Sequence, residues 1–391
     1  MTATQPTSST QPTTRTQPMG RTCPFSPPEG YRTLREEDPV TQVTFPNGTK
    51  GWLVSRYAEA RAVLADPRFG AAPQQTPLPG MFLTMDPPEH TRFRRLLTGQ
   101  FTVRRMQKLA PAIEQIVAER LEAMAAAGGP VDLVQAFALP VPSLVICELL
   151  GVPYADREEF QGNSTRMLRL DASREEVEQA QMAMYQHIQQ LVLAKRARPT
   201  DDILSGLVQS GQLTDEEVAG VGVLLLIAGH ETTANMIALG TLSLLANPGQ
   251  PAALRSDPAF MDGAVEELLR YLTIVQYGLR RVAREDVELG GQRIEAGSTV
   301  TVSLSSGNRD ATQFSGDPDT LDVRRPYSPH LAFGHGVHQC IGQQLARVEM
   351  KIALSALFER FPTLRPTVPV DQVPMREDMF VYGVHELPVT W

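Results

Sequence analysis

The sequence predicts a mainly helical α+β protein in which most of the 391 residues form one large domain. Apolar residues recur at three- and four-residue spacing through most of residues 92–272, which is the pattern of amphipathic helices. In residues 279–304 apolar and polar residues alternate around Gly-Gly and Ala-Gly pairs, a pattern typical of short strands. After Pro24 the chain shows no internal repeat and no linker long enough to separate domains. These observations favour a single domain over residues 23–391.

Composition narrows the class of protein further. Hydrophobic residues make up 42% of the chain, enough for a large core, and the formal charge of 36 − 44 = −8 argues against nucleic acid as the main partner. The three cysteines, Cys23, Cys147 and Cys340, form no disulfide framework and fit a reducing compartment. The N-terminus lacks the apolar segment of a secretory signal, so we expect a cytoplasmic protein.

The first elements follow from local signals. Residues 1–22 are rich in Thr, Gln, Ser and Pro with almost nothing to bury, and we expect this tail to be disordered. Residues 47–57 predict a hairpin strand with Asn47-Gly48 as its turn, and residues 58–66 predict a short helix. A loop punctuated by Pro and Gly, with an apolar tip, covers residues 70–92. A helix expected to end at Gly128 and a final helix from Cys340 to about residue 361 complete the main elements.

Residues 223–245 are almost entirely apolar but carry His230-Glu231-Thr232-Thr233 at their centre. The stretch is long enough to span a membrane, yet a charged residue there costs roughly 2.5–3.5 kcal/mol on insertion scales, so a buried core helix is the better interpretation. The start of the zinc motif His-Glu-x-x-His is present, but Ala234 stands where the second ligand belongs. Taken alone, Glu231 and the threonines can equally well satisfy neighbouring backbone groups.

The strongest signal is one cysteine in a glycine-rich loop, Phe333-Gly334-x-Gly336-x-His338-x-Cys340-x-Gly342. The glycines allow tight turns, and a helix starting at the cysteine lowers the pKa of its thiol, which favours the thiolate. Such a thiolate is a good axial ligand for haem iron. An inert buried cysteine, or a zinc site with His330, His335 and His338, are alternatives that leave the glycines and Phe333 unexplained.

Three motifs resemble those of the cytochrome P450 family, and the similarity runs from about Pro24 to Trp391. Residues 333–342 match the haem-binding signature, residues 228–232 resemble the oxygen-activation motif, and residues 267–270 resemble the Glu-x-x-Arg motif. The resemblance is greatest to soluble bacterial enzymes, particularly actinomycete monooxygenases of secondary metabolism and xenobiotic oxidation. It implies the cytochrome P450 fold, a triangular helical domain with small β-sheets and a long central helix over haem b (iron protoporphyrin IX).

The resemblance also implies a role for particular residues. Cys340 would ligate the haem iron in a loop shaped by Phe333, Gly334 and Gly342. Thr232 would be the key hydroxyl and Glu231 would feed protons from solvent, while Ala228 and Gly229 leave room for dioxygen. The haem propionates would be held by His90, Arg94, Arg281 and His338, with Arg95 and Arg280 as rival candidates. Glu267, Arg270 and Arg325 would form a structural ion cluster, with Arg324 as the rival to Arg325. The substrate pocket would be lined by Met81, Phe82, Leu83, Leu224, Ile227, Val275, Phe380 and Val381, although core packing also explains Met81 and Phe82.

Electrons have to come from another protein, because no dinucleotide-binding Gly-x-Gly-x-x-Gly motif follows a strand. We expect a ferredoxin, reduced by a ferredoxin reductase and ultimately by NAD(P)H. Six basic residues and no acidic one occur in residues 91–108, and with Arg347 and Lys351 they suggest a docking face: Arg92, Arg94, Arg95, Arg104, Arg105 and Lys108. The expected enzyme is a monomer that hydroxylates or epoxidises a fairly large lipophilic molecule. Oxidative ring closure or C–C coupling is the alternative, and Glu231 and Thr232 disfavour a haem sensor without turnover.

Overall fold

The computed structural model describes residues 15–71, 78–257 and 259–391. The α-helices are α1 (Gly30–Glu37), α2 (Tyr57–Ala65), α3 (Glu89–Thr98), α4 (Val103–Ala127), α5 (Pro140–Leu150), α6 (Arg157–Leu168), α7 (Arg174–Ala197), α8 (Ile203–Ser210), α9 (Asp215–Ala246), α10 (Gly249–Ser256), α11 (Phe260–Leu272), α12 (Leu304–Gly307) and α13 (Gln343–Arg360). Shorter helical turns are η1 (Phe82–Thr84), η2 (Val134–Ala138), η3 (Tyr154–Asp156), η4 (Gly336–His338) and η5 (Val370–Gln372).

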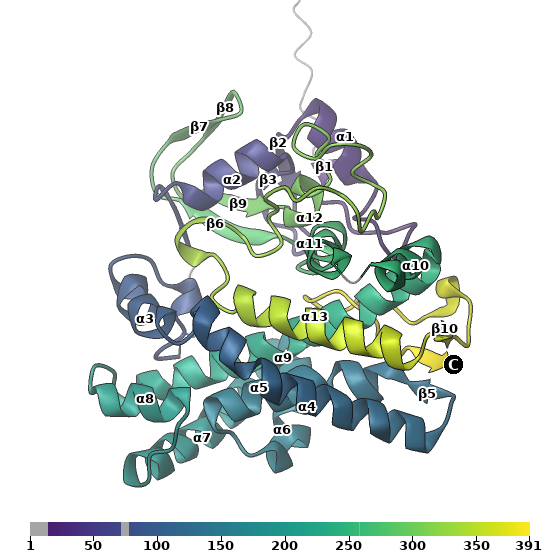
Figure 1. Cartoon of the computed structure of the whole chain (residues 1–391). Coiled ribbons are helices and arrows are strands. Elements are labelled where there is room, and N and C mark those ends of the chain that lie inside the picture. The colour runs from purple at the N-terminus through teal and green to yellow at the C-terminus, as the bar shows by residue number, and fades with distance from the viewer. Residues whose placement is uncertain (1–14, 72–77, 258) are drawn as a thin grey trace, which may run out of the picture.

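The strands form three small sheets at the margin of the helices. They are β1 (Arg15–Thr16), β2 (Val40–Thr44), β3 (Lys50–Val54), β4 (Phe69–Ala71), β5 (Val131–Asp132), β6 (Leu279–Ala283), β7 (Val287–Leu289), β8 (Gln292–Ile294), β9 (Thr299–Val302), β10 (Arg365–Pro366) and β11 (Pro388–Thr390). The largest sheet has the order β1-β2-β3-β9-β6-β4, and the others are β10-β11-β5 and β7-β8. In Figure 1 the largest sheet lies with α1 and α2 in the upper part of the molecule, and α4 to α9 lie below α13.

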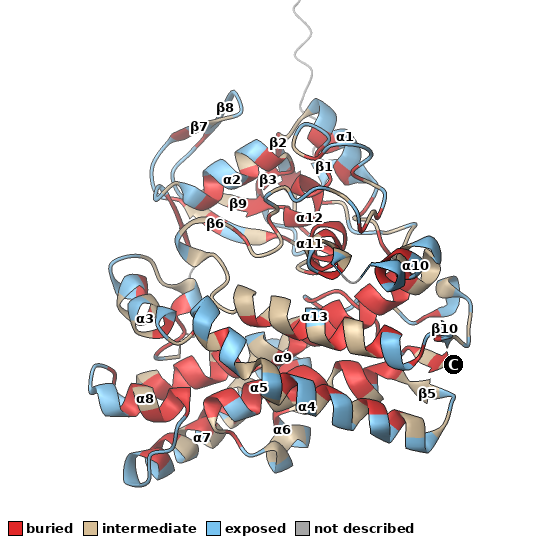
Figure 2. Cartoon of the chain, viewed as in Figure 1, coloured by how far each residue is buried: buried red, intermediate tan, exposed pale blue. Residues whose placement is uncertain are grey.

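The core is built around α9, whose side chains are buried on all sides for most of its length (Figure 2). The helix begins with a capping box in which Thr214 accepts a hydrogen bond from the Glu217 backbone N–H and Glu217 reaches back to the Thr214 N–H. It is long and apolar enough to cross a membrane, but 72% of its apolar window is buried inside the fold. Helices α5, α7 and α13 pack against it, so its hydrophobicity is that of a core helix.

The N-terminal segment differs from the expected disordered tail. Residues 1–14 lie outside the described residues, but β1 pairs in parallel with β2. Gln17 is buried and donates a hydrogen bond to the Tyr31 hydroxyl at 3.1 Å, and the Arg21 guanidinium lies 4.0 Å from the centre of the Tyr382 ring. The expectation was therefore wrong for residues 15–22. Their polar side chains are held by partners far along the chain, which local composition does not reveal.

Other local predictions agree with the structure to within a few residues. Strands β2 and β3 form the antiparallel hairpin, with a positive φ of 81° at Gly48 in its turn, and α4 ends at Ala127 just before Gly128. The final helix begins at Gln343 rather than Cys340, because the cysteine still belongs to the preceding loop. This shift places Cys340 just before the first turn of α13.

Candidate functional site

The cysteine loop is held by its own backbone. The Cys340 N–H donates to the Phe333 carbonyl at 2.9 Å, closing the loop across the residues between them. Gly336 has a φ of 74°, and a Cβ at this position would lie 2.1 Å from the Leu64 carbonyl oxygen at the end of α2. Only glycine fits there, because any other residue would collide with backbone that cannot move aside. The loop's shape therefore depends on contact with α2.

The expected lowering of the Cys340 pKa is wrong for the protein chain by itself. Burial raises the pKa of this thiol, and it outweighs the backbone hydrogen bonds from Gly342 and Gln343 and the charges of Arg94 and Arg347, which lower it. The helix N-terminus thus acts in the predicted direction but is too weak to compensate for desolvation. A metal ion's own charge deprotonates a coordinating thiol.

The centre of α9 has an open stripe in an otherwise buried helix. Leu224, Ile227 and Thr232 are only partly buried, and Ala228 is exposed. These residues follow the three- and four-residue spacing of one helix face. The Thr232 hydroxyl donates to the Ala228 carbonyl one turn earlier at 2.8 Å, so its oxygen retains lone pairs for a further partner.

Gly229 has a second contact besides the open stripe. Like Leu224, Ile227 and Thr232 it is only partly buried. A Cβ at Gly229 would lie 2.6 Å from Cγ1 of Ile146, so the glycine also allows α5 to approach α9 closely. Ala228, about 100° away around the helix, is the more exposed of the two small residues.

The two residues before Thr232 are both buried. The Glu231 carboxylate accepts a hydrogen bond from Arg376 Nη2 at 3.1 Å, a partner that sequence reasoning missed because no local motif marks Arg376. The His230 ring bonds through Nδ1 to the Leu226 carbonyl at 2.7 Å, and burial lowers the pKa of this imidazole. His230 thus points away from the Thr232 side of the helix.

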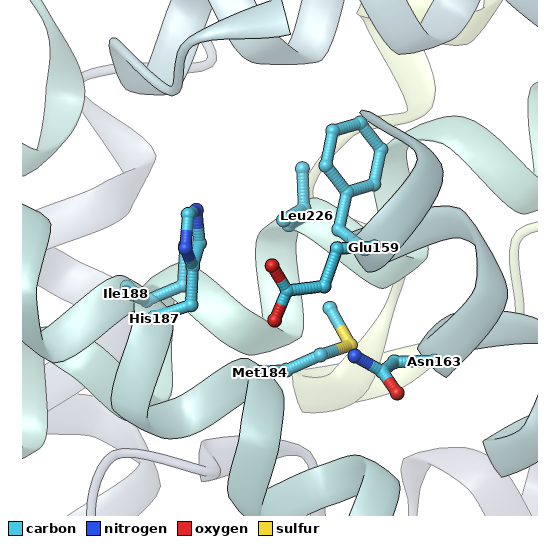
Figure 3. Close-up of a pocket in the computed structure, with 7 residues that line it drawn as sticks. Glu159, Asn163, Met184, His187, Ile188 and Leu226 are labelled. Carbon is cyan, nitrogen blue, oxygen red and sulfur yellow. The ribbon is translucent and has the colours of Figure 1, made fainter. Parts of the chain in front are cut away.

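A narrow crevice lies beside His230 but not on the open stripe. Figure 3 shows it between α6, α7 and α9, where Glu159, Met184 and His187 project into it and leave no room for a water molecule. Leu226 borders it from α9, and the Phe160 ring, which also lines it, packs against the His230 ring with centroids 5.4 Å apart. Leu226 lies about 120° from Thr232 around the helix, and no residue of the open stripe lines this crevice.

Two histidines with buried ring nitrogens, one of them wholly buried and the other partly, show where a further polar group belongs. The ring centroids of His90 and His338 are 4.2 Å apart. Among the described residues, three of their ring nitrogens have no hydrogen-bond partner: Nδ1 and Nε2 of His90, and Nε2 of His338. Burial, with the neighbouring His90, Arg281 and Arg94, lowers the pKa of His338 to about 4. Buried polar atoms need partners, and the two carboxylates of a haem would supply acceptors here.

The arginines near these histidines can now be separated from their rivals. Arg281 is buried and Arg94 is half-buried, whereas Arg280 and Arg95 are exposed. Burial lowers the pKa of Arg94 and of Arg281, and it outweighs the opposing effects of Cys340 on Arg94 and of Asp86 on Arg281. A pocket that holds two guanidinium groups and unpaired imidazoles fits the two carboxylates at the edge of a haem.

The zinc alternative has no support in the described part of the chain. No three His, Cys, Asp or Glu side chains there are arranged to hold a metal ion.

The predicted ion cluster is present in the structure. Arg270 donates to both oxygens of Glu267 at 2.7 and 2.8 Å, and Arg325 Nε donates to Glu267 at 3.1 Å. All three side chains are at least nine-tenths buried. The rival Arg324 instead lies over the Phe260 ring, 5.6 Å from its centre. The cluster joins α11 to the irregular segment that precedes the cysteine loop.

The residues expected to line the substrate pocket differ in burial. Val275, like Leu224 and Ile227, is partly buried, and Leu83 and Phe380 are exposed. Met81, Phe82 and Val381 are buried, and the Phe82 ring stacks on Phe93 with centroids 6.1 Å apart. Core packing therefore accounts for Phe82, which belongs to the main hydrophobic core.

The basic residues do not all belong to one free surface. Arg92 pairs with Glu217, Arg347 donates to Glu266 at 2.5 Å, and Lys351 lies 2.6 Å from Asp262. Glu266 also lies 3.1 Å from His330, a cluster that the sequence did not predict. Four other basic residues of the expected docking face are exposed or half-exposed, and in the described chain they form no ion pair. We call these four residues the basic face: Arg95, Arg104, Arg105 and Lys108.

The cysteine loop leads into α13, which packs against α9 with its open stripe, and unpaired imidazoles lie near Arg94 and Arg281. These are the features of a haem-thiolate protein. Residues 160–389 match the family described as Cytochrome P450. The chain is 51% identical over 369 residues to Cytochrome P450 105C1 of a Streptomyces species, covering 94% of this chain and 96% of that protein. It is 46% identical over 385 residues to pentalenic acid synthase of Streptomyces avermitilis, covering 94% and 95%.

Comparison of the fold with solved structures points to the same family. The crystal structure of CYP105P1 in complex with filipin I matches with a TM-score of 0.94 and 48% identity, covering 97% of this chain and 99% of that one. The chain belongs to the cytochrome P450 family. It is a cytochrome P450 monooxygenase similar to actinomycete enzymes that act on natural products, and the family's cofactor is haem iron.

Proposed function

We propose that this enzyme hydroxylates or epoxidises a fairly large lipophilic molecule of the macrolide, polyketide or terpenoid kind. The observation that carries the proposal is the open stripe of α9, which is apolar at Leu224, Ile227 and Ala228 and offers one hydroxyl at Thr232. Such a surface favours an apolar substrate next to a single site of proton handling. The name pentalenic acid synthase and the filipin I complex of CYP105P1 support a natural product of this size.

Bound haem would supply dioxygen activation and the transfer of one oxygen atom to the substrate. Cys340 would hold the iron as a thiolate. His90, His338, Arg94 and Arg281 would hold the two carboxylates, because these side chains lie together with unpaired ring nitrogens and unneutralised charge. Phe333 is held against Arg347, whose guanidinium lies 4.6 Å from the ring centre, and this contact stiffens the loop before the cysteine.

Proton delivery would be the work of Thr232 and Glu231. The Thr232 hydroxyl is oriented by the Ala228 carbonyl, so its oxygen can accept a proton-bearing partner on the open side of α9. Glu231 is the nearest acidic residue along the helix, and its carboxylate can take up and release a proton. The required electrons would come from a separate ferredoxin with its reductase, and ultimately from NAD(P)H, in the cytoplasm.

The deciding experiment is the absorption spectrum of the reduced protein with carbon monoxide. Thiolate ligation predicts a Soret band near ~450 nm. Cys340→Ser should abolish this band, whereas Cys147→Ser should retain it, because Cys147 is buried elsewhere and burial raises the pKa of its thiol to about 12. A Cys340→Ser protein with an unchanged spectrum would refute the assignment.

The substrate class needs a second measurement. A panel of macrolides, other polyketides and terpenoids can be screened for a low-spin to high-spin shift and then for products by mass spectrometry. Gain of one oxygen atom supports hydroxylation or epoxidation, whereas loss of two hydrogen atoms without oxygen gain indicates ring closure or coupling. Shifts confined to small polar compounds would contradict the proposed substrate class.

A further inference from the structure

Glu231 has one permanently charged partner among the described residues, Arg376. Arg376 Nη2 lies 3.1 Å from Glu231 Oε2, and the two side chains are only 12% and 4% exposed. His230 Nε2 lies 3.8 Å from the other carboxylate oxygen. However, the His230 Nδ1 bond to a carbonyl requires the proton on Nδ1, which leaves Nε2 of the neutral ring without one. The cation that Glu231 faces is therefore Arg376.

Arg376 stands in a narrow hairpin formed by residues 374–385. Met375 and Val384 form an antiparallel bridge, and the Arg376 N–H donates to the Gly383 carbonyl at 2.9 Å. The Arg376 carbonyl accepts a hydrogen bond from Gln276 at 3.2 Å. These bonds hold the backbone of Arg376 in the hairpin, so its guanidinium moves relative to α9 when the hairpin moves.

The hairpin touches α9 directly. A Cβ at Gly383 would lie 1.9 Å from Oδ1 and 2.9 Å from Cβ of Asn235, so the hairpin backbone rests on this side chain. Asn235 in turn donates from Nδ2 to the Glu231 carbonyl at 2.8 Å. Any side chain at position 383 would separate the hairpin from the helix turn that carries Glu231.

The tip of the same hairpin is attached to the end of α6. The Leu170 N–H donates to the Asp378 carbonyl at 2.9 Å, and the Phe380 N–H donates to the Leu168 carbonyl at 2.8 Å. Phe380 is exposed and belongs to the proposed substrate pocket. The hairpin thus connects a pocket residue, the end of α6 and the Glu231 carboxylate.

We propose that Arg376 is a positioning residue for Glu231 and that residues 374–385 set how closely its guanidinium approaches the carboxylate. The inference rests on the proposed proton-delivery role of Glu231. The Arg376 contact holds the Glu231 carboxylate in one orientation on α9, so loss of this contact changes the position from which the carboxylate can exchange a proton. Displacement of the hairpin tip, or of the end of α6, moves Arg376 and thereby changes proton delivery.

The test uses the haem-loaded enzyme without substrate, supplied with electrons from NADPH through a ferredoxin and its reductase. Arg376→Gln, Arg376→Lys and Gly383→Ala are each made with Glu231 and with Glu231→Gln. The measured quantities are the hydrogen peroxide formed per dioxygen consumed and the ratio of rates in H2O and D2O. Amide hydrogen exchange of residues 374–385 and the thermal midpoint give readouts that do not depend on turnover.

Arg376→Gln should change the peroxide yield and the solvent isotope effect, on the order of threefold. Arg376→Lys should retain most of the wild-type behaviour because it keeps the charge. Gly383→Ala should change both readouts in the same direction as Arg376→Gln, with faster exchange in the hairpin. All three effects should disappear when Glu231 is replaced by Gln, because the positioned group is then absent.

Two results would overturn the inference separately. If Arg376→Gln has the same effect with and without Glu231, or lowers only the thermal midpoint, Arg376 does not act through Glu231. If Glu231→Gln leaves the peroxide yield and the isotope effect unchanged, the proton-delivery role of Glu231 itself fails, and the inference fails with it. An unchanged ~450 nm band in every variant shows that haem ligation is intact in both cases.

Discussion

At the scale of single residues, polar groups in the apolar helix α9 differ in their surroundings. Thr232 lies on the open face, whereas Thr241 on the same helix is fully buried, although both hydroxyls donate to a carbonyl four residues earlier. The same backbone contact therefore serves packing at Thr241 and orients an accessible hydroxyl at Thr232. Position on the helix, not residue type, separates the two roles.

Replacement of Thr232 by Ala should uncouple electron use from product formation. NAD(P)H consumption should continue, while product falls by about tenfold or more and peroxide rises, because a positioned proton donor is lost. The measurement is product and peroxide per NAD(P)H consumed, with a substrate found by the spin-shift screen. Thr241→Ala is the matched control and should alter stability only. Full coupling in Thr232→Ala would require a different proton donor.

At the scale of elements, two ionic clusters connect α11 to the segments around the cysteine. Glu267 bonds to Arg270 and Arg325, and its neighbour Glu266 bonds to Arg347 on α13 and to His330 before the loop. Adjacent acidic residues therefore hold both sides of the cysteine loop. Their spacing on α11 fixes how α13 and the loop sit relative to each other.

Glu267→Ala should be strongly destabilising. It leaves Arg270 and Arg325 as buried charges without their carboxylate, at a cost of roughly 3–5 kcal/mol in the free energy of unfolding. Denaturant unfolding of the haem-loaded protein measures the loss. Arg360→Ala removes a control pair with Glu122 that is exposed on both sides, and it should cost less than about 1 kcal/mol. Equal losses in the two variants would contradict a structural role for the cluster.

Glu266 should make stability depend on acid pH. Burial raises its pKa, but the hydrogen bonds from His330 and Arg347 outweigh burial and lower it from 4.5 to about 2. A carboxyl with a lowered folded-state pKa stabilises the fold above its unfolded pKa and loses this contribution as pH falls from 4.5 to about 2. The contribution is on the order of 2 kcal/mol after solvent screening. Glu266→Gln should flatten the pH dependence of unfolding in this window, and an unchanged slope would contradict the assignment.

At the scale of the whole molecule, the N-terminal segment and the C-terminal strands belong to one body. The main core includes Phe25 and Val389, and β1 extends the sheet that contains β9. We propose that the chain from Arg15 onward folds as one unit. The basic face of Arg95, Arg104, Arg105 and Lys108 contrasts with a net charge of −8, and we propose that it is a docking surface for an acidic ferredoxin.

Charge reversal of the basic face, Arg104→Glu with Lys108→Glu, should slow reduction by a ferredoxin by roughly tenfold at low salt. The difference from wild type should shrink as added salt screens the charges. Stopped-flow reduction rates across ionic strength measure both effects. Arg198→Glu changes an exposed arginine at the C-terminal cap of α7; it is the control and should leave the rate unchanged. Reduction that is insensitive to salt would rule out this docking mode.

The sequence by itself determined the family, the cysteine, the apolar central helix with its hydroxyl, and the Glu267 cluster. These features are carried by short motifs whose spacing along the chain is part of the signal, so they can be read without knowing what packs around them. The hairpin at Gly48 and the end of α4 before Gly128 were predictable for the same reason, because turn chemistry is local.

Tertiary structure alone decided which neighbours these residues meet. Glu231 pairs with Arg376, 145 positions away, and Gly229 allows the close approach of α5. Arg92, Arg347 and Lys351 pair with carboxylates on other elements, and Arg94 is half-buried near the histidine pair, which leaves four residues in the basic face. Desolvation of Cys340 reversed the expected direction of its pKa. Burial and long-range pairing depend on which segments pack together, and no single stretch of sequence contains that information.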